Sequence, residues 1–321
     1  MTRAVIARAP TRLDFGGGWT DVPPYTEREG GAVCNVAIAR YATASVREQP
    51  AGTHAQRDPL ISAAIRRSAV RNAAVDLASD YPIGAGLGGS SAAGVALAGA
   101  LAAVAGESLD AQALALRSRD TEVSEMEVPG GYQDHFAAAF GGALLLTFTE
   151  SVAVRRIALR ADTRAALARR GILIYTGESR ISGDTIVAVR DAYLAGERRV
   201  VTALGRMKAL AFEMAAALEQ GDVDTLAALV GEHWAHQRKL HSTISTPLID
   251  DIARIAPAAG CLGLKALGAS GGGCVLAFAR EGDEERLATA LAPFGQRLPY
   301  AIDLAGFEII ASLASSGEAS E

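Results

Sequence analysis

The hydrophobic residues of the first fifty positions are spaced as they are in strands. Residues 2–9, with Val5 and Ile6 among them, are expected to form a strand that Pro10 ends, because proline cannot donate a ladder hydrogen bond. A glycine pair then turns the chain into residues 32–39, and residues 41–47 alternate between apolar and polar positions. The pattern therefore predicts a β-rich opening.

Helical spacing begins further along the chain. Residues 60–74 place Ile61, Ile65 and Ala69 on one face, and a second helix is expected from about 108 to 123. The other elements that the pattern predicts are strands at 75–78, 143–148, 171–175, 275–279 and 307–311, a helical region at 185–240 with breaks at 196 and 221–222, and helices at 247–256 and 284–291.

The stretch 82–106 combines a glycine-rich loop with a helix. Glycine occupies positions 84, 86, 88 and 89, and Ser90, Ser91 and an alanine-rich apolar run follow. Bare backbone can wrap closely around an anion, serine can cap a helix, and alanine propagates it. Amide groups at the positive end of such a helix form a phosphate site.

This loop has other interpretations. Gly84, Gly86 and Gly89 match the dinucleotide pattern G-x-G-x-x-G, but Pro82 separates the loop from any strand. The spacing up to Ser90 approaches a P-loop but lacks its lysine, so the positive charge would have to come from a metal or from elsewhere. A glycine-rich turn that leads into an ordinary core helix is the third interpretation.

Two further segments place carboxylates beside bare backbone. Residues 16–18 are all glycine, with Arg12 and Asp14 before them and Asp21 after. A carboxylate such as Asp21 can accept the hydroxyl hydrogen bonds that sugar recognition requires. A glycine pair also comes shortly before Asp134, which can take a proton from a hydroxyl. A polar turn and a helix N-cap are the simpler alternatives for these two carboxylates.

A second glycine-rich turn, residues 268–273, precedes the expected strand 275–279. Two such loops far apart in one chain indicate a ligand that is held from both sides. His233, His236 and His241 lack a well-placed third ligand and the H-E-x-x-H pattern, so we expect surface or core histidines rather than a zinc site.

Composition narrows the class of protein. The 321 residues are 50% hydrophobic and carry a formal net charge of −5, so neither nucleic acid nor a membrane is expected as a partner. The three cysteines are scattered and no signal peptide is apparent, which favours core thiols and a cytoplasmic location. An arginine-rich segment from 149 to 170 indicates domains at 1–150 and 151–312, and residues 313–321 are expected to be disordered.

Three segments together resemble the motifs of the GHMP kinases, which phosphorylate galactose, homoserine, mevalonate, phosphomevalonate and related alcohols. They are residues 9–21, 84–92 and 268–273, and their order and spacing match over about residues 3–311. The resemblance implies an α+β fold in two domains. The N-terminal α/β domain would contain a left-handed βαβ unit, an exception to the usual crossover rule, and the C-terminal domain would be ferredoxin-like.

Within the family, the chain is most similar to the sugar kinases of the heptose 7-phosphate and L-fucose branch. The segments that carry this likeness are 17–21 with the prolines 23 and 24, 131–134, 175–177 with Arg180, and 233–240. That branch phosphorylates the anomeric hydroxyl to give a sugar 1-phosphate.

The resemblance assigns a role to each motif. Asp134 would be the general base and Arg12 would orient it, while Ser91 and Glu122 would bind Mg²⁺. The ATP phosphates would be bound by Gly84, Ala85, Gly86, Leu87, Gly88, Gly89, Ser90 and Ser91. The substrate would be bound by Asp21, Gly16, Gly17, Gly18, Trp19, Gly271, Gly272, Tyr175 and Arg180. Two departures are Gly89, where relatives commonly have serine or threonine, and His135, where they often have glutamine.

The sequence thus predicts an enzyme that uses ATP and Mg²⁺ to phosphorylate a small sugar or sugar phosphate. D-glycero-D-manno-heptose 7-phosphate is the first candidate substrate, L-fucose or another sugar is the alternative, and a homodimer is left open. A nicotinamide-dependent dehydrogenase would need Gly84, Gly86 and Gly89 to follow a strand directly. A non-catalytic sensor is disfavoured because Ser91, Glu122 and Asp134 are all present.

Overall fold

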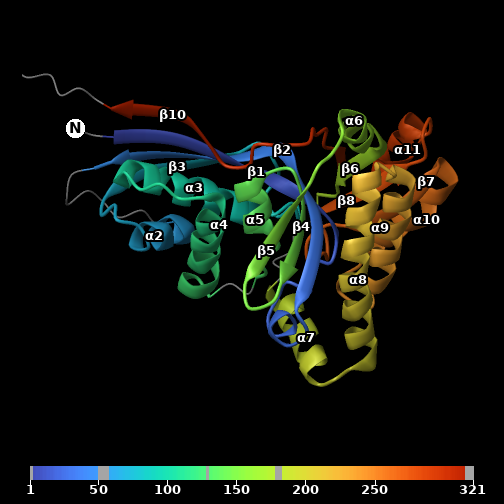
Figure 1. Ribbon diagram of the computed structural model, residues 1–321. Helices are drawn as coiled ribbons and strands as arrows, with labels where there is room; N and C mark the ends of the chain where they lie inside the picture. The colour runs from blue at the N-terminus through green and yellow to red at the C-terminus, as the bar shows by residue number, and fades with distance from the viewer. Residues whose placement is uncertain (1–2, 50–57, 128–129, 178–182, 315–321) are drawn as a thin grey trace, which may run out of the picture.

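The computed structural model describes residues 3–49, 58–127, 130–177 and 183–314 (Figure 1). The first part of the chain, together with β10 from the end of the sequence, builds an antiparallel sheet in the order β10-β1-β2-β4-β5, with β3 also paired to β2. Its strands are β1 (Arg3–Gly16), β2 (Gly31–Glu48), β3 (Ala73–Ser79), β4 (Ala143–Phe148), β5 (Val152–Ile157) and β10 (Glu308–Ala314).

Strand β1, which lies with β2 at the centre of this sheet, is longer than the sequence predicts. Pro10 does not end β1, which continues to Gly16. The pairing of β1 with β2 shifts its register between Pro10 and Thr11, so the proline lies at an irregularity in the ladder. A bulge is where a strand can tolerate a residue without an N–H. The strand therefore delivers Arg12 and Asp14 to the middle of the molecule.

One layer of helices covers this sheet, and its central helix is α3 (Gly89–Ala105). This helix is apolar nearly all round and packs against β1 and β2 on one side and α4 and α5 on the other. The helical elements of this half are α1 (Tyr25–Glu29), α2 (Pro59–Arg66), α3, α4 (Ala111–Asp120), the π-helical turn η1 (Thr121–Glu125) and α5 (Gln133–Phe140). The polypeptide from β3 to β4 passes through α3, α4 and α5, and the left-handedness of this connection stays a prediction.

The second sheet has the expected ferredoxin-like topology. Its strands β6 (Gly171–Tyr175), β7 (Cys261–Ala266), β8 (Cys274–Ala279) and β9 (Gln296–Arg297) lie in the antiparallel order β7-β8-β6-β9. Helices separate β6 from β7 and β8 from β9, which gives the strand and helix order of that fold. The helices of this half are α6 (Ala161–Arg170), α7 (Gly183–Leu194), α8 (Arg198–Gln220), α9 (Val223–Gln237), α10 (Pro247–Ile255) and α11 (Glu284–Leu291), with 3₁₀ turns at Ala256–Ala259 and Ala292–Phe294.

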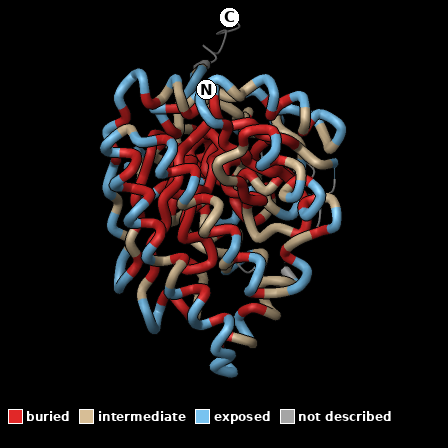
Figure 2. Tube along the Cα trace, turned by 90° about the vertical axis from the view of Figure 1, so that its right-hand side faces the viewer, coloured by how far each residue is buried: buried red, intermediate tan, exposed pale blue. Residues whose placement is uncertain are grey.

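The two halves share strands and core. Strand β5 continues the first sheet beyond residue 150, and β10 returns to it from the end of the chain, so the expected boundary falls inside the β4–β5 hairpin. Buried residues of both halves form one cluster, in which the Phe15 and Phe278 rings lie 6.0 Å apart. Figure 2 shows this buried centre surrounded by exposed segments. We propose that the domain limit lies after β5.

Several expected elements are confirmed, and others were missed. The strand at 171–175 and the breaks at Gly196 and Gly221 occur as predicted, whereas β5, α6 and β7 were not foreseen. Cys34 and Cys274 are buried core thiols as expected, and Cys261 is partly buried. Most of the expected disordered tail lies outside the described residues. Among the helices of the described residues, none is both long and apolar enough to cross a membrane.

Candidate active site

The two glycine-rich loops lie against each other although they are far apart in sequence. The Cys274 amide donates a 2.8 Å hydrogen bond to the Ala85 carbonyl oxygen. A Cβ built on Gly86 would lie 2.6 Å from the Leu267 carbonyl oxygen, and one built on Gly268 would lie 3.2 Å from the Gly86 Cα. Because only glycine permits such close approach of two backbones, both loops need this residue here. The two loops therefore lie side by side, while a ligand held between them stays a prediction.

The first loop ends at the N-terminus of α3. Gly88 precedes the helix in the left-handed conformation with φ 75°, and no side chain of a described residue caps the helix. The first amide groups of a helix have no partner within it. These groups and the helix dipole therefore form a site suited to a phosphate, with Ser91 buried one turn inside.

Arg12 and Asp134 form a two-fold ion pair beside this helix end. Arg12 donates from Nε to Asp134 Oδ1 at 2.8 Å and from Nη2 to Oδ2 at 2.9 Å. Its remaining Nη1 donates to the Gly86 carbonyl oxygen at 2.6 Å. The Arg12 side chain is 3% exposed and that of Asp134 is 27% exposed. The arginine thus ties a partly accessible carboxylate to the glycine loop.

The position of Asp134 depends on Gly88. A Cβ built on Gly88 would lie 3.0 Å from the Asp134 Cγ. The carboxylate therefore lies directly against the loop that leads into α3, at Gly88, which is three residues before Ser91.

Ser91 and Glu122 also meet, as the sequence predicts. Ser91 Oγ donates to Glu122 Oε2 at 3.3 Å, and His135 Nε2 lies 3.1 Å from the same oxygen. Burial would raise the pKa of Glu122, but the hydrogen bond and charge of His135 and the hydroxyls of Ser90 and Ser91 bring it below its ordinary value. Glu122 is therefore an ionised carboxylate in a mostly buried place.

Asp21 has a structural task that sequence reasoning missed. Its Oδ2 accepts hydrogen bonds from the Tyr132 amide at 2.9 Å and the Gln133 amide at 3.0 Å, which fixes the start of α5. Burial raises the pKa of this carboxyl to about 6, against the lowering effect of the two amides. Asp21 therefore positions the helix that carries Asp134.

Polar groups that were not predicted gather around the glycines at 16–18. Lys265, which is fully buried, donates to Asp14 Oδ2 at 3.0 Å, and a Cβ built on Gly18 would lie 2.5 Å from that oxygen and 3.0 Å from Gln133 Nε2. Among the described residues, buried polar atoms without a hydrogen-bond partner include Asp14 Oδ1, Gln133 Oε1, both ring nitrogens of His233 and Gln237 Oε1. Such atoms are expected where a polar ligand binds. Asp14, Gln133, His233 and Gln237 lie in segments that resemble the family, but no role was assigned to them, and Lys265 lies outside these segments.

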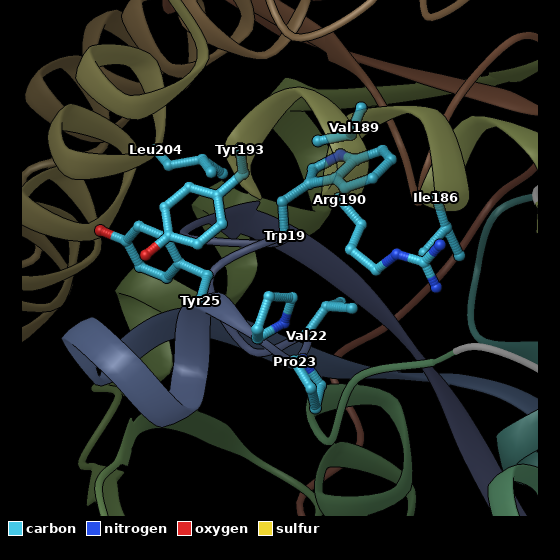
Figure 3. Close-up of a pocket in the computed structure, with 10 residues that line it drawn as sticks. Trp19, Val22, Pro23, Tyr25, Ile186, Val189, Arg190, Tyr193 and Leu204 are labelled. Carbon is cyan, nitrogen blue, oxygen red and sulfur yellow. The ribbon is translucent and has the colours of Figure 1, made fainter. Parts of the chain in front are cut away.

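Trp19 faces an apolar pocket rather than these polar groups (Figure 3). Its indole lies near Val189 and Arg190 of α7, while Tyr25 and Tyr193 pack edge to face at 5.3 Å. Trp19 is 8% exposed and has a positive φ of 78°. Its side chain therefore contributes to the packing of α7 against the segment between β1 and β2.

The remaining predicted substrate residues lie around the second loop. The Gly271 amide donates to the Ile244 carbonyl oxygen at 2.9 Å, and Tyr175, the last residue of β6, pairs with Cys274, which directly follows the loop. The next residue, Thr176, donates from its amide to the Gly273 carbonyl oxygen at 3.0 Å. Arg180 lies outside the described residues.

A helix N-terminus lined by two glycine-rich loops, next to a carboxylate paired with an arginine, defines a phosphate-transferring enzyme. The sequence pattern of "GHMP kinases N terminal domain" matches residues 59–142, and that of "GHMP kinases C terminal" matches residues 214–296. The chain belongs to the GHMP kinases, and is therefore a kinase with the two-domain fold of that family.

Named proteins resemble the chain over most of its length. It is 25% identical to D-glycero-alpha-D-manno-heptose 7-phosphate kinase of Campylobacter jejuni, covering 86% of this chain and 89% of that protein. It is 26% identical to L-fucokinase/L-fucose-1-P guanylyltransferase of Bacteroides fragilis, covering 86% of this chain but 35% of that longer protein. The crystal structure of a D-glycero-D-manno-heptose 1-phosphate kinase from Bacteroides thetaiotaomicron has the same fold, with a TM-score of 0.76 at 22% identity over 98% of this chain and 99% of that one.

Proposed function

We propose that this kinase transfers the terminal phosphoryl group of ATP to the anomeric hydroxyl of a sugar, with D-glycero-D-manno-heptose 7-phosphate as the first candidate substrate. The observation that carries the proposal is the Arg12–Asp134 pair against the glycine loop. In this proposal, a hydroxyl that approaches a phosphate bound at the start of α3 meets the Asp134 carboxylate. The likeness to named heptose phosphate kinases and fucokinases supports a sugar as the acceptor.

Ser91 and Glu122 fit a magnesium ion by their chemistry. Both offer oxygen, which is the ligand atom that Mg²⁺ prefers. The described residues contain no group of three or more His, Cys, Asp or Glu side chains arranged to hold a metal. Magnesium commonly binds one or two carboxylates and completes its shell with phosphate and water oxygens, so two protein ligands are sufficient. When bound, it would neutralise the phosphate charge that the absent P-loop lysine leaves uncompensated.

Separate groups of the protein bind the phosphates, accept the proton and bind the sugar. The free amides at the start of α3 hold the phosphates, and the loop at 268–273 closes the site from the other side. Asp134 accepts the proton of the attacking hydroxyl, and Arg12 holds the carboxylate in one plane. We propose that the glycines at 16–18 and Asp14 bind the sugar with Trp19, Tyr175, Gly271 and Gly272 nearby.

The dehydrogenase alternative does not fit the fold. The strand expected at 75–78 is present as β3, but it ends at Ser79 and belongs to an antiparallel sheet. The dinucleotide fingerprint works in a parallel, doubly wound sheet. Gly84, Gly86 and Gly89 therefore carry no support for a nicotinamide enzyme.

The test is ATP consumption with free and phosphorylated hexoses and heptoses, followed by phosphorus NMR of the product. Turnover with heptose 7-phosphate and a new phosphate on the anomeric oxygen are expected. Turnover with L-fucose alone would select the alternative substrate. Binding of sugars without any turnover would overturn the proposal in favour of a sensor.

Asp134→Asn tests the base. We expect kcat to fall by about 10²–10⁴-fold, because the amide cannot take the proton. Asp251→Asn, at an exposed surface pair with Arg254, is the control and should keep full activity. An Asp134→Asn enzyme as fast as the parent would contradict the assigned role.

A further inference from the structure

His135 joins three elements at the candidate metal site. Its Nε2 lies 3.1 Å from Glu122 Oε2 and 3.3 Å from Ser91 Oγ, and its Nδ1 lies 3.0 Å from Ser118 Oγ. The imidazole is 2% exposed and Ser118 is 1% exposed. The ring is therefore held on both sides in a place that water hardly reaches.

The contacts decide which nitrogen faces the carboxylate as a donor. The Ser118 hydroxyl can donate to Nδ1, which leaves the ring proton on Nε2. A lone pair on Nε2 would face the Glu122 carboxylate oxygen 3.1 Å away, whereas an Nε2–H donates to that oxygen. In the neutral and in the protonated ring alike, Nε2–H donates to Glu122.

The backbone around His135 leaves room for these hydrogen bonds. A Cβ on Gly94 of α3 would lie 2.5 Å from Ser118 Oγ, so glycine leaves the room that the hydroxyl occupies. Glu122 stands in the π-helical turn η1, directly after α4. Such turns widen a helix locally and redirect a side chain. The arrangement brings Ser118, Glu122 and His135 together from consecutive segments of the chain.

We propose that His135 is a positioning residue that holds Glu122 in the orientation needed to bind the divalent cation, with Ser118 as its anchor. This inference rests on the proposed function, since the cation site is part of it. Histidine and carboxylate partners that orient a metal ligand typically change metal affinity by 10–100-fold when they are removed. His135 acts through Glu122 and not on the sugar.

The test measures metal binding directly. Mn²⁺ is titrated into the protein saturated with ADP, and electron paramagnetic resonance of the free Mn²⁺ gives the dissociation constant of the metal. Calorimetry gives the affinity for ADP in the absence of metal. His135→Leu should weaken Mn²⁺ binding about 10–100-fold and leave metal-free ADP binding unchanged. His135→Gln, which restores a side-chain donor, should remain within about three-fold of the parent.

Ser118→Ala keeps the inference testable if His135→Leu does not fold. It removes one hydroxyl and should weaken Mn²⁺ binding several-fold, whereas Ser68→Ala, beside the end of α2, should have no effect. Unchanged Mn²⁺ affinity in either site variant, or an equal loss of metal-free ADP binding, would overturn the positioning role. A parent protein that binds ADP equally with and without Mn²⁺ would instead overturn the proposed function, and this inference with it.

Discussion

The ion pair between Lys265 and Asp14 is a buried contact on which the stability of the protein depends. The two side chains are 0% and 2% exposed and come from β7 and β1, so the pair joins the two sheets. Burial lowers the pKa of Lys265, while the charge and hydrogen bond of Asp14 raise it in part. Neither group can be removed alone without leaving an unpaired polar group in the core.

Lys265→Met should destabilise the protein by about 3–5 kcal/mol, because it leaves the Asp14 carboxylate buried and unpaired. The double variant with Asp14→Leu should recover much of this loss, since no charge then remains. Urea unfolding measures all three proteins. The exposed pair Arg254–Asp251 provides the control: Arg254→Gln should change stability by less than about 1 kcal/mol. A loss of similar size for both pairs would contradict the argument.

At the scale of elements, the loop before α3 depends on glycine for two separate reasons. Gly88 has a φ of 75°, which costs a residue with a Cβ about 1–2 kcal/mol. That Cβ would also press on Asp134. The first effect acts on stability and the second on the site, so a matched variant can separate them.

Gly88→Ala should therefore lower stability by about 1–2 kcal/mol and lower kcat at least about ten-fold, because a small displacement of the base is costly. Gly196→Ala has a φ of 70° and nothing within 4 Å of the added Cβ, so it should lose similar stability with unchanged kcat. Thermal unfolding and steady-state kinetics give both quantities. Equal kcat in the two variants would show that Gly88 does not position Asp134.

Elements with a local cause could be predicted from the sequence, and those set by distant contacts could not. The glycine loops and the alanine-rich helix follow from backbone freedom and alanine propensity, so they were found. The expected serine cap was wrong, because α3 begins at Gly89 and includes Ser90 and Ser91. Pro10 was misjudged because a bulge against β2 keeps the strand intact. The pair of Asp14 and Lys265 spans 251 positions, and no local pattern records it.

At the scale of the whole molecule, buried titratable groups set the response to acid. His233 is fully buried, and burial, followed by the charges of Lys265 and His236, holds its pKa well below its ordinary value of 6.5. The unfolded chain therefore binds a proton below pH 6.5 that the folded chain does not. The stability due to the neutral ring is present above pH 6.5 and is lost as the pH falls.

His233→Met should remove this loss. The free energy of unfolding of the variant relative to the parent should rise by about 1 kcal/mol between pH 8 and pH 5.5. Asp21, whose pKa is raised to about 6, acts in the opposite direction in both proteins and cancels in the comparison. Val230→Ala, on the same helix, removes buried atoms without a titrating group and should show the same deficit at both pH values. The expectation fails if His233→Met behaves like Val230→Ala.

The last strand of the chain lies beside the first. Strand β10 pairs with β1, and Arg8 meets Glu308 at 2.7 Å across a separation of 300 positions. During synthesis on the ribosome, that edge of β1 stays unpaired in the emerging N-terminal half until the residues of β10 have been translated. A gene truncated shortly before Glu308 would thus yield a protein with an unpaired sheet edge. Such a protein is prone to aggregate instead of reaching its folded state.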